Sequence, residues 1–283
     1  MINGIVANKF TVKNLLIIRK NHTFANLKQK IMSKISAVII TYNEERNIAR
    51  CLQSLQGVAD EIIVVDSGSI DKTAEICKAF NVRFEQREWD NFSFQKNYGN
   101  TLSSFDYILS IDADEVLSEE LRNEIVVEKQ SFEYDAYSFN RLTFFYGKPI
   151  KHCGWYPDRK VRLFNKRKAC WEGNVHETLR FSEPFSVKFL SGDLLHYTTD
   201  SLFTQIEKIN KYSDVYAIAA IAKGQKAGLL KLIFKPKYKF FYVYFIKLGF
   251  LDGWNGFLIS YLSALDIFFR LCKIRMYQSC KLS

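Results

Sequence analysis

The chain has 283 residues, enough for one large domain or two small ones. Hydrophobic residues make up 48% of it, so a sizeable core is possible, and only four prolines argue against long disordered stretches. The net charge of +10 is uneven: residues 1–34 hold seven Lys or Arg and no acidic residue, and residues 229–283 hold nine against two. The middle is mildly acidic. This excludes a uniformly basic nucleic-acid-binding protein and directs the basic ends toward phosphates or an anionic membrane surface.

Residues 35–112 alternate between short β-branched runs and helical periodicity. We expect strands over 35–41, 61–66, 81–86 and 107–112, with helices over 44–56, 70–80 and 92–104 between them. Such alternation with short connections predicts βαβ units and a mainly parallel, right-handed central sheet with flanking helices, an α/β fold.

After Asp114 the pattern is looser. It predicts helices over 119–128 and 201–223 and strands over 136–145 and 160–164. We therefore divide the chain into a basic N-terminal arm, an α/β domain and a helical, basic and aromatic C-terminal part, with bounds of 1–33, 34–200 and 201–283.

The N-terminal arm does not resemble a signal peptide, because its apolar run, Leu15–Ile18, is short and is bracketed by Lys13 and Arg19. Met32 directly precedes the first predicted strand. It is a candidate for the true start, in which case residues 1–31 lie upstream of the protein or form a dispensable arm.

The C-terminal part mixes apolar and basic residues. Residues 229–250 interleave five lysines with Leu, Ile, Phe and Tyr, and residues 254–271 are mostly apolar but carry Asp266 and Arg270. Neither stretch is a run of about 20 apolar residues, as a membrane-spanning helix requires. We expect helices that lie in the interface of an anionic leaflet. The alternative is a basic helical hairpin packed on the domain.

The six cysteines include no Cys-x-x-Cys pair, a spacing that suits neither a structural zinc site nor a dense disulfide framework. We expect reduced thiols in a cytosolic compartment.

Three predicted strands end in polar clusters, Thr41–Glu44, Asp66–Ser69 and Asp112–Glu115. Ligands of open parallel sheets bind beyond the carboxyl ends of the strands, so we expect the clusters to meet at one crevice.

Asp112 and Asp114 stand two residues apart, and in an extended chain alternate side chains share a face. Both carboxylates could then reach one divalent cation, Mg²⁺ or Mn²⁺. Helix caps at Asp114 or Ser118, and a turn after Asp66 in which Ser69 caps the next helix, are the structural alternatives. A Gly-x-Gly-x-x-Gly motif is absent, which argues against a dinucleotide oxidoreductase.

Four segments, Val38–Glu45, Glu61–Ser69, Gln95–Asn97 and Asp112–Glu115, together resemble the family-2 inverting glycosyltransferases. Within that family the chain looks like the lipopolysaccharide-core β-glucosyltransferase branch. The resemblance covers about residues 35–200 and implies a GT-A-type nucleotide-diphosphosugar-binding fold.

The resemblance also implies roles for individual residues. The uridine pocket would be lined by Thr41, Tyr42 and Glu44, with Asp66 on the uracil and Lys96 and Asn97 beside the nucleotide. Asp112 would contact ribose or metal, and Asp114 would ligate the divalent cation that bridges the donor's two phosphates.

Inversion at the anomeric carbon needs a base that takes the proton of the attacking hydroxyl. Residues 171–177 look like the Trp…Val-His-Glu segment of the family branch. Glu177 is the first candidate for the base and Glu172 the second. His176 is either a metal or phosphate ligand or a structural residue.

Further candidates follow from residue chemistry. Arg159 and Arg162, with Lys160, could clamp the diphosphate, because guanidinium pairs well with phosphate; the alternative is a solvated edge strand. Trp155 and Tyr156 are candidates for stacking on a sugar face or for core packing. We assign no physical role to His196, which recurs in similar sequences.

We therefore expect a metal-dependent glycosyltransferase, peripheral on the cytosolic face of the inner membrane, that uses a UDP-sugar, with glucose as the expected hexose. The acceptor would be a lipid-linked saccharide such as the lipopolysaccharide inner core, and nucleic acid is not an expected partner. The alternatives are transfer to another glycan or to protein, a nucleotidyltransferase, and a non-enzymatic basic membrane adaptor. A nucleotidyltransferase would need a Gly-rich triphosphate loop after the first strand, and residues 41–44 offer none.

Overall fold

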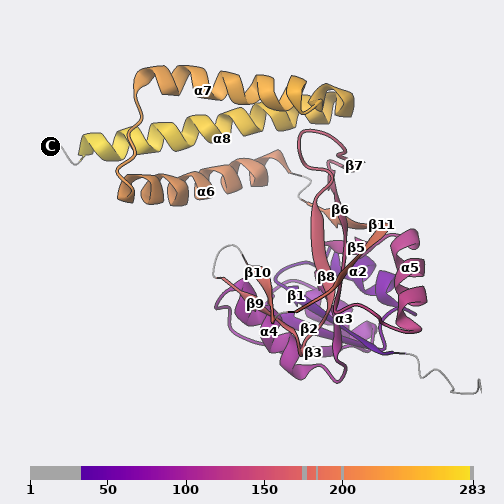
Figure 1. Cartoon of the computed structure of the whole chain (residues 1–283). Coiled ribbons are helices and arrows are strands. Elements are labelled where there is room, and N and C mark those ends of the chain that lie inside the picture. Colours follow the sequence, from indigo (N-terminus) through magenta and orange to yellow (C-terminus); the bar gives the residue numbers. More distant parts are fainter. Residues whose placement is uncertain (1–32, 174–176, 183, 199–200, 281–283) are drawn as a thin grey trace, which may run out of the picture.

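The computed structural model describes residues 33–173, 177–182, 184–198 and 201–280. Residues 1–32 of the N-terminal arm, including the candidate start at Met32, lie outside the described residues, as does His176. An α/β domain holds a nine-stranded sheet, and the C-terminal helices form a separate layer beside one end of it (Figure 1).

The first half of the sheet is parallel and follows the predicted alternation. Its strands are β1 (Ile35–Thr41), β2 (Glu61–Asp66), β3 (Arg83–Gln86) and β4 (Tyr107–Asp112), in the spatial order β3-β2-β1-β4. β1 is buried along its whole length between β2 and β4, which explains its continuous β-branched sequence.

Beyond β4 the sheet is mixed. β8 (Arg159–Asn165) runs antiparallel to both β4 and β6 (Ala136–Phe145), β11 (Val187–Tyr197) runs parallel to β6, and the edge strand β5 (Glu115–Leu117) runs antiparallel to β11. β7 (Lys148–Pro149) pairs with the end of β6. The α/β fold class with a central sheet is confirmed, but parallel pairing dominates only its first half. β11 was not predicted, because a bulge between Phe189 and Asp193 interrupts its alternation.

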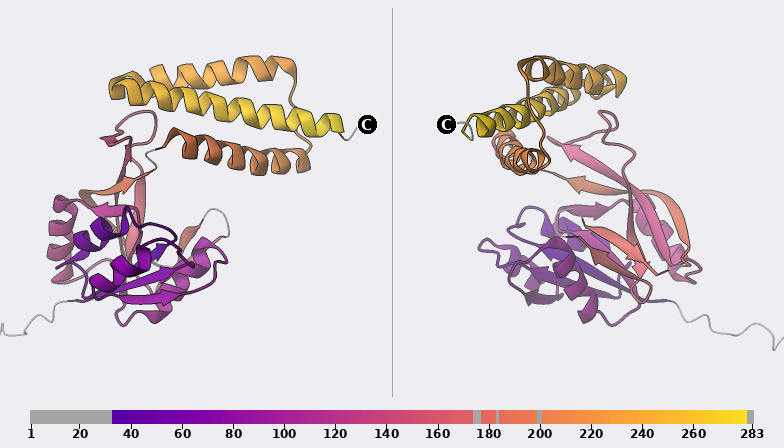
Figure 2. Two further views of the ribbon diagram at one scale, coloured as in Figure 1. Left: turned by 180° about the vertical axis from the view of Figure 1, so that it is seen from behind. Right: turned by 60° about the vertical axis from the view of Figure 1, so that its left-hand side comes forward.

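The helices of the domain cover both faces of the sheet (Figure 2). α2 (Ile48–Leu55), α3 (Thr73–Ala79) and α5 (Glu119–Lys129) pack on one face, and α4 (Phe92–Leu102) packs on the other. α4 lies close to β1, since a Cβ on Gly99 would clash with Val38. α2 begins four residues later than predicted, because the Glu44 amide donates to the Thr73 hydroxyl and holds residues 44–47 in a turn.

A two-stranded hairpin of β9 (Ala169–Glu172) and β10 (Thr178–Phe181) packs beside α4. Asn97 of α4 fastens it, donating to the Trp171 carbonyl at 2.8 Å and accepting from the Trp171 amide at 3.0 Å. The hairpin thereby brings Glu177 toward the sheet.

The C-terminal layer consists of α6 (Leu202–Ala222), α7 (Leu229–Phe241) and α8 (Gly253–Cys280), with α6 and α7 both packed on α8 (Figure 1). A π-helical turn (Tyr242–Ile246) and a 3-10 turn (Gly249–Asp252) connect α7 to α8. Among the helices described, none is both long and apolar enough to cross a bilayer.

The β6–β7 hairpin joins the two layers. Phe145 and Cys153 pack into one apolar cluster with Val243 and Ile259 of the helical layer. The Asn255 side-chain amide donates to the Phe145 carbonyl at 2.6 Å. The helical layer is therefore held on the α/β domain by buried contacts.

Candidate active site

The polar ends of β1, β2 and β4 lie side by side. Thr41 is in register with Asp66, and Ile40 with Asp112. Beyond them lies a cavity of about 250 Å³, here called the donor cavity. It is lined by Ile40, Thr41, Tyr42, Glu44, Ser67, Trp89, Phe92, Asp112, Ala113, Asp114 and His196.

Three of the predicted nucleotide-binding residues line this cavity: Thr41, Tyr42 and Glu44. The hydroxyl of Thr41 is buried and has no hydrogen-bond partner among the residues that the structure describes. Burial raises the pKa of Glu44, although its carboxylate accepts a 2.6 Å hydrogen bond from Asn47. The aromatic side chains of Trp89 and Phe92, which the sequence analysis did not single out, complete the wall.

Asp66 organises the loop that follows β2. Its buried carboxylate accepts hydrogen bonds from the backbone amides of Gly68 at 3.0 Å and Ser69 at 2.8 Å, and from the Ser69 hydroxyl. It does not line the donor cavity, whereas its neighbour Ser67 does. Ser69 caps no helix; its hydroxyl oxygen instead accepts from the Asn43 amide of the neighbouring loop.

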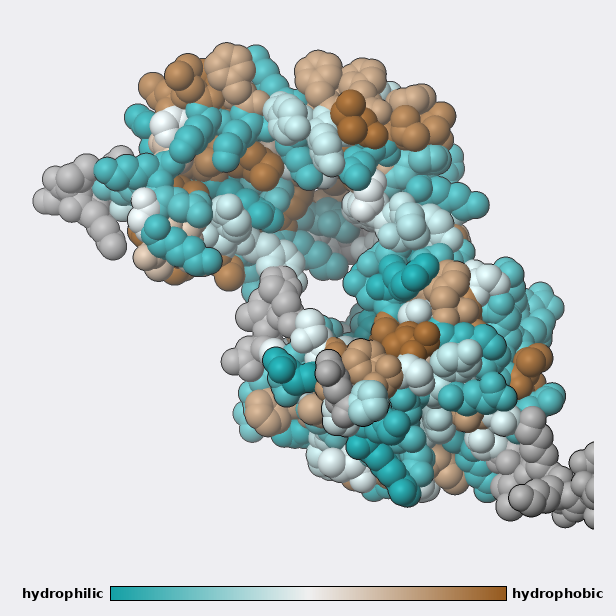
Figure 3. All heavy atoms as spheres, viewed as in Figure 1, coloured by the Kyte–Doolittle hydropathy of each residue, from teal (hydrophilic) through white to brown (hydrophobic). Residues whose placement is uncertain are grey.

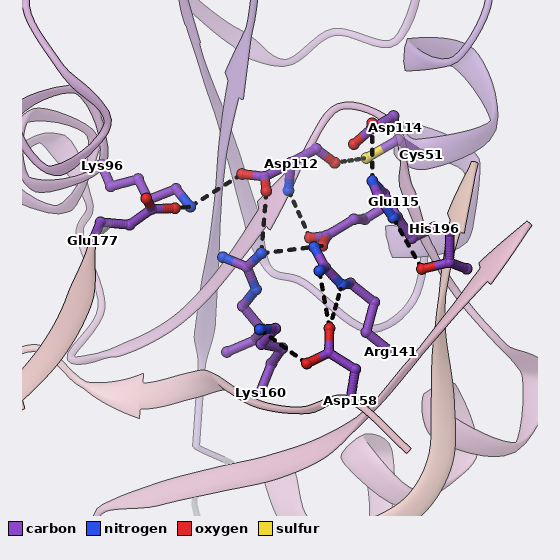
Figure 4. Close-up of polar contacts among 12 residues, drawn as sticks. Cys51, Lys96, Asp112, Asp114, Glu115, Arg141, Asp158, Lys160, Glu177 and His196 are labelled. Carbon is purple, nitrogen blue, oxygen red and sulfur yellow. Dashed lines mark hydrogen bonds and ion pairs between the residues drawn. The ribbon is translucent and has the colours of Figure 1, made fainter. Parts of the chain in front are cut away.

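Asp112 lies between two cations (Figure 4). The Lys96 ammonium is 3.1 Å from its Oδ1, and the Arg162 guanidinium is 3.1 Å from its Oδ2. Burial on its own would raise the pKa of Asp112, but Lys96 and Arg162 outweigh burial and hold that pKa well below its usual range. Both carboxylate oxygens thus face protein cations at the boundary of the donor cavity.

Glu115 is a buried counter-charge that the sequence analysis did not assign. It is fully buried, and its Oε1 lies 3.0 Å from Arg162 and 3.6 Å from Arg141. Its other oxygen accepts from the Asp112 amide at 2.9 Å. The sequence signal that could have identified Glu115 was its place in the Asp112–Glu115 motif. Arg141 lies within a strand and belongs to no motif, so no sequence signal pointed to it.

Asp114 faces His196 across the end of the sheet (Figure 4). Asp114 Oδ2 and His196 Nε2 are 3.2 Å apart, and both residues line the donor cavity. A carboxylate oxygen and an imidazole nitrogen this close can both contact one divalent cation at bond lengths of about 2.1 Å. The described residues contain no cluster of three or more His, Cys, Asp or Glu arranged for a metal. The pair therefore fits a cation whose remaining ligands come from phosphate and water, as is usual for Mg²⁺.

Glu177 is positioned by Lys96, whose ammonium lies 3.1 Å from Glu177 Oε1 as well as beside Asp112. Lys96 is fully buried, and its ammonium lies over the Trp171 ring at 4.8 Å from the centroid. The second candidate base, Glu172, is exposed and pairs with Arg180 across the β9–β10 hairpin at 2.6 Å. The geometry thus brings Glu177, not Glu172, to the end of β4.

A second cavity of about 510 Å³, here called the basic cavity, adjoins the first through Asp112. Its lining includes Glu177 and the cations Arg141, Arg159, Lys160 and Arg162. Arg162 lies at its buried floor, while Arg159 is exposed and lies over the Phe189 ring at 4.1 Å. Lys160 pairs with Asp158 at 3.0 Å.

Two further candidates have mainly structural contacts. The Tyr156 hydroxyl donates to Asp193 at 3.1 Å, and Asn97 is the clamp on β9 described above. Trp155 packs edge-on against Phe145 and lines a third cavity of about 410 Å³, here called the middle cavity, together with Arg141 and His196.

Comparison with known proteins identifies the family of the chain. Residues 36–193 match the model of the family described as "Glycosyl transferase family 2". The chain belongs to this family, and its fold is of the GT-A type that the resemblance implied.

Relatives that match this chain over most of their own length support the same family assignment. An uncharacterized glycosyltransferase of Rickettsia felis is 34% identical over 86% of this chain and 90% of its own length. The lipopolysaccharide core biosynthesis glycosyltransferase LpsC of Rhizobium meliloti is 31% identical over 83% of this chain and 92% of its own length. The resemblance to family 2 and to its lipopolysaccharide-core branch is confirmed.

Solved structures are more distant. Staphylococcus aureus TarS 1–349 is 13% identical, covers 87% of this chain and 92% of its own, and has a TM-score of 0.43. Glucosyl-3-phosphoglycerate synthase of Mycobacterium tuberculosis, solved with Mn²⁺, UDP and glucosyl-3-phosphoglycerate, is 24% identical over 40% of this chain and 44% of its own, with a TM-score of 0.31. Likeness at this level transfers no ligand or role to the present chain.

Proposed function

We propose that this glycosyltransferase moves a hexose, glucose as the expected sugar, with inversion from a UDP-sugar to a lipid-anchored saccharide. The observation that carries the proposal is the donor cavity of about 250 Å³ at the ends of β1, β2 and β4. Its lining combines the Asp114–His196 pair with the buried hydroxyl of Thr41, which has no hydrogen-bond partner in the described part of the chain. Such a site at the carboxyl ends of parallel strands suits a nucleotide.

The nucleotide side of the cavity is aromatic and polar. Tyr42, Trp89 and Phe92 provide faces for a base, and the Thr41 hydroxyl and Glu44 carboxylate provide hydrogen-bonding groups. The loop after β2 is held in place by Asp66, so Asp66 shapes the pocket through Ser67 rather than by lining it.

Asp114 and His196 would hold a divalent cation, Mn²⁺ or Mg²⁺. When bound, such a cation neutralises charge that develops on the departing nucleoside diphosphate. Lys96 and Arg162 occupy the two oxygens of Asp112, so we do not assign Asp112 to the cation and leave it the ribose-side role that the resemblance implies. Arg159 adds positive charge next to the same site, whereas the charge of Arg162 is balanced by Asp112 and Glu115.

Glu177 would accept the proton of the acceptor hydroxyl. It lines the basic cavity, which meets the donor cavity at Asp112, so an acceptor there approaches the sugar from outside the nucleotide pocket. Lys96 fixes the carboxylate at this boundary, as a positioned base requires.

A lipid-anchored, anionic acceptor is supported by two observations. One is the similarity to LpsC, whose name states a role in lipopolysaccharide core biosynthesis. The other is Arg159 in the basic cavity, an exposed guanidinium that forms no ion pair with any described residue, whereas the cavity's other three cations are paired with carboxylates. An unpaired guanidinium suits a phosphorylated or carboxylated saccharide.

The helical layer supports a peripheral membrane position. On α7 and the following turn, one stripe of apolar side chains is exposed at helical spacing: Leu230, Phe234, Tyr238, Phe241 and Phe245. Apolar side chains gather over this edge of the molecule (Figure 3). Exposed Lys231 and Lys235 flank the stripe. An apolar stripe flanked by lysines fits an anionic leaflet, and we place the protein on the cytosolic face of the inner membrane.

The decisive experiment incubates the purified protein with a panel of UDP-sugars, Mn²⁺ and truncated-core lipopolysaccharide. We expect one hexose to be added to the acceptor and UDP to be released, both detected by mass. Release of pyrophosphate would instead indicate a nucleotidyltransferase. Absence of Mn²⁺-dependent UDP binding by calorimetry would indicate a non-enzymatic adaptor.

A further inference from the structure

A long groove runs between α6 and α8 on the helical layer. It encloses about 840 Å³, and this feature is here called the helix groove. One face of α6 contributes Gln205, Ile209, Tyr212 and Tyr216. The α6 residues that line it, from Gln205 to Ala219, span about 21 Å at 1.5 Å per residue, so the groove is long enough for several sugar units.

The helix groove is continuous with the reaction centre. Trp155, Gln205 and Lys208 line both the helix groove and the middle cavity. His196 lines both the middle cavity and the donor cavity. The Lys208 charge also acts on Glu44, which lies in the wall of the donor cavity. Arg141 lines both the middle cavity and the basic cavity that holds Glu177. A ligand in the helix groove can therefore extend past Trp155 toward Glu177 and the sugar being transferred.

The groove's lining is mostly apolar, but it also contains a group of polar and charged side chains. Asp266 and Arg270 form an ion pair of 2.7 Å within it, and the Arg270 guanidinium lies over the Tyr216 ring at 4.5 Å. Gln205 and Ser263 add hydrogen-bonding groups. Covering these groups with hydrocarbon would cost free energy, whereas sugar hydroxyls can hydrogen-bond to them.

A second groove, between α7 and α8, offers the contrast. It encloses about 540 Å³ and is lined mainly by Phe240, Phe241, Phe257, Leu265 and Phe268. Hydrocarbon suits that lining and belongs on the membrane-facing stripe of α7. The helix groove thus offers an ion pair and several hydrogen-bonding groups, whereas among the residues described the second groove has only Lys237 and Tyr261 as polar lining residues.

We infer that the helix groove binds the saccharide portion of the acceptor that lies beyond the reacting sugar. This inference rests on the proposed function and names the acceptor subsite. Tyr212 and Tyr216 offer aromatic faces for sugar rings, and the Asp266–Arg270 pair offers hydrogen bonds. The Lys208 ammonium, at the junction with the middle cavity, forms no hydrogen bond or ion pair with any residue in the described part of the chain. It is placed to meet an anionic substituent of the acceptor.

The test fills the groove without touching the donor cavity. Val215 is 54% exposed and lines the groove, while Ile218 on the same helix is 61% exposed and does not. Val215→Trp is compared with Ile218→Trp as the matched control. Each is assayed with truncated-core lipopolysaccharide and with the core oligosaccharide released from it by removal of the lipid.

We expect Val215→Trp to raise the KM for both acceptors at least tenfold, with UDP affinity in Mn²⁺ unchanged, and Ile218→Trp to behave as wild type. An unchanged KM for both acceptors would overturn the inference. So would a raised KM for the lipid-bearing acceptor alone, which would indicate a hydrocarbon site. If Val215→Trp does not fold, Tyr212→Ala is the second variant, because it removes a ring that is 58% exposed. This variant must then raise the KM for both acceptors. Failure of the proposed function is distinguishable, because wild-type protein would then transfer no sugar to either acceptor.

Discussion

His196 Nε2 lies 3.2 Å from Asp114 Oδ2, although the two residues are 82 positions apart in the chain. The contact exists because β11 pairs antiparallel with β5, which sets His196 opposite Glu115. The Tyr197 amide also donates to the Asp114 carbonyl at 2.9 Å. The end of β11 therefore completes the turn that follows β4.

Asp114→Asn should lower transfer by about 100-fold or more, because the charge of one cation ligand is lost while the side-chain volume is kept. Asp106 lies just before the opposite end of β4 and pairs with Arg167. Its substitution, Asp106→Asn, is the control and should leave transfer unchanged. Initial rates at saturating UDP-glucose, measured across a Mn²⁺ titration, check this. His196→Gln should raise the Mn²⁺ concentration that gives half-maximal rate. Wild-type turnover in Asp114→Asn would remove the metal-ligand assignment.

Glu177→Gln should lower kcat by a factor of about 10²–10⁴, the usual contribution of a positioned base. The affinity for UDP should change little, because Glu177 lines the basic cavity and not the donor cavity. Single-turnover rates and calorimetric UDP titrations separate the two quantities. Glu172→Gln, in the same hairpin, is the control and should retain activity. A collapse of UDP affinity in Glu177→Gln would contradict the base role.

Glu115→Gln should destabilise the fold by about 3–5 kcal/mol, because it removes a fully buried anion that compensates Arg162. Urea unfolding followed by circular dichroism measures the change in the free energy of unfolding. Glu133→Gln, at an exposed position, should change it by no more than about 0.5 kcal/mol. Equal free energies of unfolding for the two variants would show that the Glu115–Arg162 pair makes no net contribution to stability.

Replacing Lys231 and Lys235 together by Gln should weaken binding to vesicles that contain anionic lipid by about 30-fold, at about 1 kcal/mol per lysine near the surface. Lys72→Gln with Lys78→Gln, on exposed positions around α3, removes the same charge and should have little effect. Co-sedimentation at low ionic strength measures the partition. If both double variants bind equally well, the α7 surface is not the membrane-binding face.

The parallel half of the sheet and the three polar strand ends could be predicted because these features are local. A strand such as Ile35–Thr41 is buried on both faces, so its sequence is continuously β-branched, and the residues that follow it must lie at the same sheet edge as those after its parallel neighbours. Family membership could likewise be inferred from short motifs placed in order.

The partners of those motifs could not be predicted, because antiparallel and bulged pairing brings together residues that no local pattern connects. Arg141 and His196 arrive from β6 and β11, and Lys96 arrives from α4 to link Asp112 with Glu177. The sequence by itself determined the class of fold, the acidic turn after β4 and the basic, aromatic ends of the chain. Only the tertiary structure decided which cation faces which carboxylate and where the helix groove opens, because those relationships depend on strand register and on helix packing across the chain.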